Sequence, residues 1–374
     1  MLPKLYDELV TGNSTYNYSF LGTLNCCTKC EVKEVRNGAY TLSMETTIND
    51  DCAGMLLSQR LIGVKPNPTD NMQLFEIQKT TRTIDGIIKV EAKHIKNLCF
   101  QICSEGDLTT EGNKTVVNCT PLEAWELLKE DYIDSEVPFT FTSDITTKAD
   151  FSIGLDSPET LGNILGGKEG AFTDLWNGEY HWDNLNISFN RERGRISSFQ
   201  IRYGQNVSDA SQIETCESTY SHVLPYGKIS NGNKKINFFA PIFEIENSSA
   251  KHQKVYMCDC TDFLEAYTVG DKGEGYDEAQ AAMTEYAKTY AAVNNLGQIS
   301  VSISVSFRPL LDDMSSVSLC DTVDVILDNF GTKAKAKIVE VTYDALLERW
   351  EKLVIGSPTI TVADIILNKR RYIQ

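Results

Sequence analysis

Alternating apolar and polar positions dominate the first hundred residues of the chain and predict β-strands. Residues 30–45 carry the dipeptide Asn37-Gly38 between two alternating runs, and residues 77–95 carry Asp85-Gly86 in the same arrangement. Both dipeptides favour the tight turn of a β-hairpin. Apolar and charged residues alternate strictly over residues 88–93, as expected when one face of a sheet is buried and the other meets solvent.

Three segments show helical signals instead. Thr120, followed by Pro121, caps a segment that predicts a helix as far as Lys129. Ser157, also followed by proline, predicts the start of a second, short helix. Residues 277–294 place alanine, methionine and tyrosine at three-to-four spacing and predict one long helix, which we expect to pack on a sheet rather than against another chain.

Strand-like runs resume near residue 181 and continue to residue 355. They include residues 300–307, where every second residue is serine, and a closing segment, 361–374, is expected to form a short helix with a basic tail. Strand-rich blocks therefore occupy about 1–102 and 186–358. This pattern predicts a mainly β or α+β fold with two β-barrel or sandwich units and α+β insertions.

Length, composition and charge narrow the class of protein. With 374 residues, 41% hydrophobic and 23% charged, the chain is expected to form about two to four globular domains. No apolar run approaches the ~20 residues that span a bilayer, and the first residues lack the pattern of a secretory signal. A formal charge of −17 argues against tight binding to nucleic-acid phosphates but permits DNA to pass nearby.

The eleven cysteines raise the question of a metal site. Cys26 or Cys27 together with Cys30 could supply half of a zinc site, but the chain has no second C-x-x-C pair. Cys258 and Cys260 alternate as strand residues do. We therefore expect free thiols and no metal or cofactor.

The stretch GNILGGKEG, residues 162–170, fits all but the last position of a phosphate-binding loop. Glu169 occupies the position of the hydroxyl that would hold magnesium, and the preceding residues predict a helix rather than a strand. We interpret Gly166 and Gly167 as the end of a short helix and do not predict a nucleotide site.

Catalytic signals are weak. The four histidines form no metal-binding pair and no G-x-S-x-G motif occurs, so the sequence favours no Cys and His pair over another. The cluster from Glu179 to Asp183, EYHWD, could offer an acid and a base. We interpret it as a turn entering a strand, with its aromatic rings packed, and predict no catalytic or cofactor-binding residue.

The run from Leu165 to Asn206, LGGKEGAFTDLWNGEYHWDNLNISFNRERGRISSFQIRYGQN, resembles phage tail proteins of the prophage endopeptidase tail family, also called tail-associated lysin or baseplate hub proteins. Segment 73–95 is similar to the N-terminal region of that family. The positions that match the family pattern are Gly166, Gly167, Gly170, Asp174, Trp176, Gly178, Glu179, Asp183, Asn184, Ile187, Arg193, Gly194, Ile201, Arg202, Tyr203, Gly204 and Asn206.

This resemblance implies a homotrimeric hub at the distal end of a phage tail or related injection machine. Two tail-tube-like β-barrels in each subunit would let three chains cap a sixfold tube. The domains expected on this basis are a first barrel at 1–102, an α+β insertion at 103–185, a second barrel at 186–245 and 300–358, a second insertion with the long helix at 246–299, and a helical tail at 359–374.

The resemblance also implies partners and alternatives. Expected neighbours are tail tube or distal tail proteins, the tape measure protein, and fibres or spikes, with DNA passing through the lumen unbound. Longer family members continue into a wall-cutting domain or a fibre, whereas this sequence ends at Gln374. Two alternatives remain: a tail-associated peptidoglycan endopeptidase, in which Cys99, His181 or Glu179 would be essential, and a component that binds host-wall glycans.

Overall fold

A computed structural model of the chain describes residues 1–12, 15–103, 113–131, 138–154, 159–167, 170–202, 207–217, 219–232, 234–264, 266–270, 272–307, 317–327 and 332–356. Strands predominate in these residues, so the predicted mainly β class is confirmed. The expected start of the short helix at Ser157 and the expected tail at 361–374 lie outside the described residues. No helix in the described part is long and apolar enough to cross a membrane.

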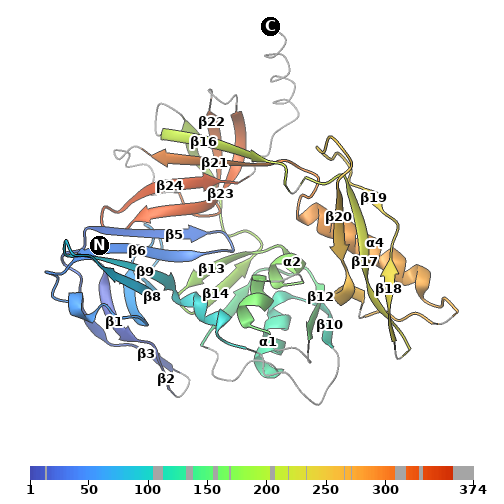
Figure 1. The fold of residues 1–374 in the computed structure, drawn as a ribbon, viewed down its shortest axis with the longest axis horizontal. Helices are drawn as coiled ribbons and strands as arrows, with labels where there is room; N and C mark the ends of the chain where they lie inside the picture. Colours follow the sequence, from blue (N-terminus) through green and yellow to red (C-terminus); the bar gives the residue numbers. More distant parts are fainter. Residues whose placement is uncertain are drawn as a thin grey trace, which may run out of the picture.

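One large sheet joins the two strand-rich blocks (Figure 1). Its path is β16-β21-β24-β23-β5-β6-β9-β8-β7-β1-β4, with β22 paired to β23 and β15 paired to β22. The thirteen strands are β1 (Lys4–Glu8), β4 (Phe20–Thr23), β5 (Lys29–Val35), β6 (Tyr40–Thr47), β7 (Arg60–Val64), β8 (Gln73–Arg82), β9 (Ile87–His94), β15 (Ile196–Arg202), β16 (Val207–Thr215), β21 (Ser300–Phe307), β22 (Thr322–Leu327), β23 (Thr332–Asp344) and β24 (Arg349–Ile355).

The two blocks meet because β23 is long. Its residues 332–337 pair with β22, whereas residues 340–344 pair with β5 in the antiparallel sense. A single core then runs beneath both blocks, from Leu5 to Ile355. The expected β-barrel form of the two units is not confirmed: in the residues described, the blocks share one sheet and its path from β16 to β4 does not close.

Both predicted hairpins are present in this sheet. β5 and β6 flank the turn at Asn37, which adopts a left-handed φ of 52°. β8 and β9 flank Gly86, whose φ is 80°. Side chains of β9 alternate between core and solvent from Ile88 to His94, which confirms the period of two read from the sequence.

A second hydrophobic core, rich in aromatic side chains, is formed by residues from 98 to 189. Helix α1 begins as predicted, because Thr120 and Glu123 cap each other: the Thr120 amide donates to Glu123 Oε2 (2.7 Å), and the Glu123 amide donates to Thr120 Oγ1 (3.3 Å). The elements here are β10 (Asn113–Cys119), α1 (Pro121–Asp131), β11 (Thr140–Ser143), β12 (Ala149–Gly154), the π-helix η3 (Asn163–Gly167), α2 (Phe172–Trp176), β13 (Glu179–Asp183) and β14 (Asn186–Asn190).

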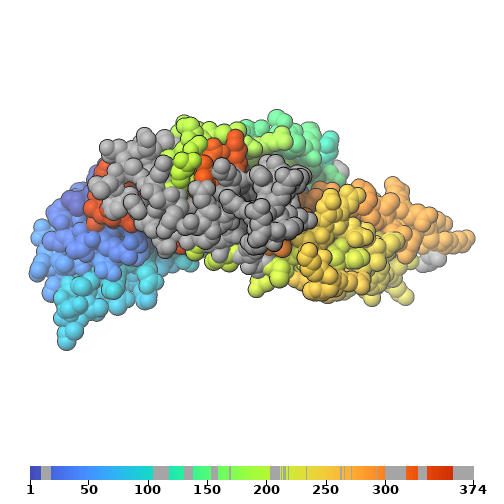
Figure 2. All heavy atoms as spheres, turned by 90° about the horizontal axis from the view of Figure 1, so that it is seen from above, coloured from blue at the N-terminus to red at the C-terminus, as the bar shows by residue number. Residues whose placement is uncertain are grey.

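A third core joins a small sheet to the long helix α4 (Tyr276–Val293). Ala279, Met283 and Ala287 are fully buried, so the predicted helix packs on a sheet as expected. This unit lies at one end of the molecule, in yellow and orange in Figures 1 and 2. Its other elements are β17 (His222–Asn231), β18 (Lys234–Phe239), β19 (Phe243–Glu244), β20 (Val255–Asp259) and α3 (Thr261–Leu264).

Short elements complete the described part. The strands β2 (Val10–Gly12) and β3 (Thr15–Asn17) pair with each other, and the 3-10 helices are η1 (Ala53–Met55) and η2 (Ile95–Phe100). A fourth, smaller cluster contains Tyr6, Leu61, Leu74 and Ile95, and Leu98 and Leu185 pack against it. It ties the large sheet to the aromatic core.

Candidate functional site

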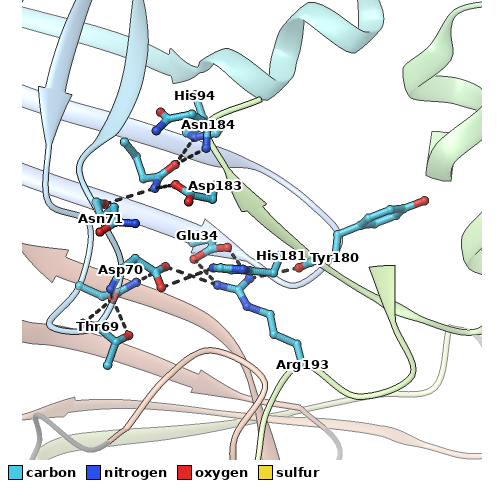
Figure 3. Close-up of polar contacts among 12 residues, drawn as sticks. Glu34, Thr69, Asp70, Asn71, His94, Tyr180, His181, Asp183, Asn184 and Arg193 are labelled. Carbon is cyan, nitrogen blue, oxygen red and sulfur yellow. Dashed lines mark hydrogen bonds and ion pairs between the residues drawn. The ribbon is translucent and has the colours of Figure 1, made fainter. Parts of the chain in front are cut away.

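A polar cluster forms where the large sheet meets the aromatic core, and we call it the junction (Figure 3). Strand β13 of the aromatic core, the loop after β14, and strands β5, β8 and β23 of the large sheet all contribute to it. Four of its members, Glu179, Asp183, Asn184 and Arg193, are positions that match the family pattern. The junction residues are Glu34, Arg36, Asn37, Asp70, Gln73, His94, Glu179, His181, Asp183, Asn184, Arg193 and Lys337.

Glu179 is the most heavily bonded carboxylate of the junction. Its side chain is only 6% exposed, and Oε1 accepts from Lys337 Nζ (2.7 Å) and Arg36 Nη1 (3.4 Å). Oε2 accepts from the backbone amide of Arg193 (2.8 Å). Two cations and one amide thus occupy both oxygens, and Glu179 holds three segments together instead of facing a substrate cleft.

Arg193 lies beside Glu34 in a buried two-point ion pair. Nη1 and Nη2 of Arg193 reach the two Glu34 oxygens at 2.5 and 3.3 Å, and Nη1 also donates to the backbone oxygen of Tyr180 (3.2 Å). Burial alone would lower the pKa of Arg193, but the adjacent Glu34 carboxylate raises it overall. The planar guanidinium therefore stays charged and fixes the loop after β14 to β5.

Asp70 completes the charged half of the junction. Its oxygens lie 3.4 Å from His181 Nε2 and 3.9 Å from Arg193 Nη2. Burial acts to raise the pKa of Asp70, but hydrogen bonds from His181 and Asn67 and the charges of His181 and Arg193 lower it overall. The folded state therefore favours the ionised carboxylate form of Asp70.

The other half of the junction is organised by the side-chain amides of Gln73 and Asn184. Gln73 Nε2 donates to Asp183 Oδ1 (2.9 Å), and Gln73 Oε1 accepts from the amide of Asn184 (2.7 Å). Asn184 Oδ1 accepts from the Leu74 amide (2.8 Å). Asn184 has a positive φ of 53°, which asparagine tolerates better than most residues.

His94 is fully buried next to Gln73. Its Nδ1 accepts from the Lys96 amide (3.1 Å), so the proton sits on Nε2, which donates to Gln73 Oε1 (3.0 Å). The ring stacks on Tyr40 with centroids 4.4 Å apart. Burial holds the pKa of His94 well below its usual range, so this histidine is a neutral structural group.

The arrangement offers no activated nucleophile or acid–base pair. Burial raises the pKa of Cys99 to about 12 and that of Cys320 to about 12, so neither thiol supplies a thiolate at neutral pH. Glu179 and Asp183 accept bonds within the fold. Across the described residues, no group of three or more His, Cys, Asp or Glu side chains could hold a metal ion.

A second candidate is the Ser221 and His222 pair beside an open pocket of about 480 Å³. Ser221 Oγ lies 2.8 Å from His222 Nδ1. The same oxygen accepts from the Lys254 amide (2.9 Å) and lies 3.2 Å from the Lys254 carbonyl oxygen. Ser221 therefore joins the start of β17 to residue 254, and it is not poised as a nucleophile.

The glycine stretch that resembled a phosphate loop has a different structure. Residues 163–167 form the π-helix η3, and Gly170 adopts a φ of 76°. A Cβ on Gly167 would lie 2.5 Å from Asn163 Oδ1. Lys168 and Glu169, like Tyr203, Gly204 and Asn206 of the family pattern, lie outside the described residues.

At two other glycines of the family pattern, the surrounding atoms leave no space for a side chain. A Cβ on Gly194 would lie 2.0 Å from the backbone oxygen of Cys320, and one on Gly178 would lie 2.5 Å from the ring of Phe189. Gly178 lies inside the aromatic core, whereas Gly194 brings the loop after β14 against Cys320 of the large sheet's core, and a Cβ has no room at either position.

Sequence reasoning missed the partners that the large sheet supplies. These partners are more than a hundred residues away in the sequence from the groups of β13 and Arg193 that they bind. They are Glu34, Asp70, Gln73 and Lys337. Nothing in their local sequence marks them, because an isolated Glu or Gln on a strand is ordinary. Only a pairing signal between distant positions could have found them.

Comparisons with known proteins agree with the resemblance. Residues 195–366 match the sequence model of the family described as prophage endopeptidase tail. A search of curated proteins found no match. The match begins after Gly194, so the residues of β13 and Arg193 precede the matched range.

Solved structures share the fold over nearly the whole chain. Prophage tail protein gp18 from Listeria monocytogenes EGD-e is 13% identical, with 99% of each chain covered and a TM-score of 0.57. The 43 kDa tail protein of prophage MuSo2 from Shewanella oneidensis is 11% identical, with 95% of this chain and 98% of that chain covered and a TM-score of 0.61. A tail protein from Neisseria meningitidis MC58 is 11% identical over 96% and 97%, with a TM-score of 0.56.

Proposed function

From the match of residues 195–366 to the prophage endopeptidase tail family, we propose that this protein is a structural component of a phage or phage-like tail. More specifically, it is a hub: three copies close the distal end of the tail tube and adapt its sixfold symmetry to threefold. It is made in the bacterial cytoplasm and becomes part of the virion tail.

The observation that carries this proposal is the joining of two strand-rich blocks through β5 and β23 over one core. Each chain thereby places two sheet-forming units side by side in a fixed orientation. Three such chains would present six units around an axis, which is what an adaptor between threefold and sixfold rings requires.

The division into domains is also proposed. We keep a first tube-like unit at 1–102 and a second one that contains β21 to β24. The aromatic core includes Ile187 and Phe189, and the third core includes Val223 and Phe238. On this basis we assign β13 and β14 to the first insertion and β17 to β20 to the second.

A structural role also accounts for the junction. Its buried ionic groups bind one another, and their combined effect is to fix the large sheet, the first insertion and the second strand-rich block in one arrangement. A hub that must hold a ring under load needs such rigid connections between units. The peptidoglycan endopeptidase alternative would instead require a reactive group that faces solvent.

The outer face of β5, β6 and β9 supports passage of DNA without binding. Two lysines on this face have glutamate partners: Lys33 with Glu340 at 2.9 Å and Lys89 with Glu45 at 3.4 Å. Lysines that are paired with glutamate attract DNA phosphates less strongly than unpaired lysines do. If this face lines the lumen, DNA phosphates would meet a mixed surface rather than a basic one. The proposed protein partners are tail tube or distal tail proteins, the tape measure protein, and fibres or spikes.

Sedimentation of the purified chain and a zymogram test this proposal together. We expect a species of three times the 41.8 kDa chain mass, alone or on addition of tube protein, and no clearing of peptidoglycan. A chain that stays monomeric with tube protein and joins no ring would contradict the hub. Clearing that is lost in Glu179→Gln, with folding retained, would favour the enzyme, and saturable binding to wall glycan would favour a receptor-binding component.

A further inference from the structure

The small sheet of the third unit has one face that nothing in the described residues covers. Helix α4 packs on the opposite face and buries Ala279 and Met283 there. On the open face, Phe239 is 51% exposed and Met257 is 66% exposed. The unit lies at one end of the molecule in both views (Figures 1 and 2), and the exposure of these two side chains makes the face accessible to a partner.

Half of the open face is apolar. Leu224 on β17 lies opposite Met257 on β20, and Tyr226 on β17 lies opposite Phe239 on β18. Leu224 and Tyr226 are two residues apart on one strand, so the four side chains adjoin. None of the four belongs to the core beneath the sheet. Contiguous exposed aromatic and methionine side chains are typical of protein interfaces.

The other half of the same face is basic. Along β17 the next outward position is Lys228, opposite Asn237, and the one after it is Ser230, opposite Lys235. Lys228 and Lys235 are exposed in a chain whose formal charge is −17. Asp259, opposite Tyr226, is engaged by its bonds from the Thr261 amide (3.0 Å) and hydroxyl (2.6 Å). A complementary partner must therefore be apolar at one end and acidic at the other.

Strand β18 borders this face and is an edge strand. It pairs with β17 on one side, and the described residues place no strand on its other side. In an antiparallel ladder, alternate residues of an edge strand turn their N–H and C=O groups outward. One of these groups, the Phe239 oxygen, accepts from Gln280 Nε2 (3.0 Å). The remainder of the edge can receive one more strand.

We propose that β18 binds an extended segment of another tail protein by strand addition. This inference rests on the proposed function, which supplies the tail as the setting. Outward positions on β18 are Lys235, Asn237 and Phe239. A strand paired to β18 places its side chains opposite these positions, so the partner segment carries Asp or Glu opposite Lys235 and a large apolar residue opposite Phe239. The two partner residues are thus four positions apart.

Site-specific cross-linking in assembled tail particles tests this assignment. A photoreactive amino acid replaces Phe239 in one variant and Ile84 in a control, because Ile84 is exposed on a hairpin tip of the first strand-rich block. We expect position 239 to cross-link to one peptide of another tail protein with the four-residue spacing of acidic and apolar residues. The control should not give that product.

Charge reversal provides the second arm. Lys228→Glu combined with Lys235→Glu should reduce the yield from position 239 by about tenfold, whereas Lys93→Glu on β9 should not. Circular dichroism confirms that each variant is folded. An unchanged yield, a cross-link to another copy of this chain, or a peptide without the acidic residue would each overturn the assignment.

The design separates failure of the inference from failure of the proposed function. If the chain is absent from purified tail particles, the tail role itself is wrong. If the chain is present and position 239 gives no cross-link, the tail role stands and the strand-addition site is wrong.

Discussion

At the residue scale, the junction depends on ionic groups that have lost most of their contact with water. Arg193 and Glu34 side chains are 11% and 6% exposed. Arg193→Met would leave Glu34 buried without its guanidinium, and we expect a loss of about 3–5 kcal/mol of unfolding free energy. Urea unfolding measures it, with Glu34→Gln/Arg193→Met expected to recover part of the loss. The exposed Lys79 and Glu91 pair is the matched control: Glu91→Ala should cost at most about 1 kcal/mol. Equal losses at both sites would show that burial does not matter.

At the element scale, glycines set how closely the cores approach. Gly194 lies in the loop before β15, and a Cβ there would meet the Cys320 backbone oxygen at 2.0 Å. Because backbone cannot rotate away as a side chain can, Gly194→Ala should lower the melting temperature by several degrees or prevent soluble expression. Gly54→Ala in η1 is the matched control, since a Cβ there meets nothing within 4 Å. A Gly194→Ala protein as stable as the control would show that the loop moves freely against residue 320.

At the scale of the whole molecule, two groups make stability fall on acidification. The folded-state pKa of His94 lies well below 6.5, mainly because the ring is buried. Only the unfolded chain then takes up this proton as the pH drops below about 6.5. The contribution of His94 to the free energy of unfolding is therefore complete above that pH and is lost as the pH falls below it. The pKa of Asp70 is lowered from 3.8 despite burial, so Asp70 also makes stability fall on acidification, at lower pH.

Unfolding midpoints measured between pH 7.5 and 5 check this dependence. His94 alone should give a slope of up to about 1.4 kcal/mol per pH unit. His94→Gln should be less stable than the parent at pH 7.5 but should lose less on acidification. A variant whose pH profile runs parallel to that of the parent would exclude His94 as the source.

Local patterns were sufficient for much of this protein. Four features each depend on residues that are close together in the sequence, and the structure contains all four. They are the alternation in 88–93, the Asn37 turn, the cap at Thr120 and the spacing in the long helix. The family resemblance read from 165–206 is likewise a local pattern, and the family match and similar folds support it.

Only the tertiary structure decided how these pieces connect. No local signal says that β23 is shared by β22 and β5, because strand pairing depends on edges brought together from distant positions. For the same reason the sequence could name Glu179 only as a candidate of the endopeptidase alternative and could not identify its partner, whereas Lys337, 158 residues away, binds it in the fold. The sequence by itself determined the two hairpins, the start of α1 and the long helix, since these depend on neighbours along the chain. Glu179–Asp183, which the sequence predicted as a turn entering a strand, is itself the strand β13. Burial and charge pairing, which set what those residues can do, depend on neighbours in space.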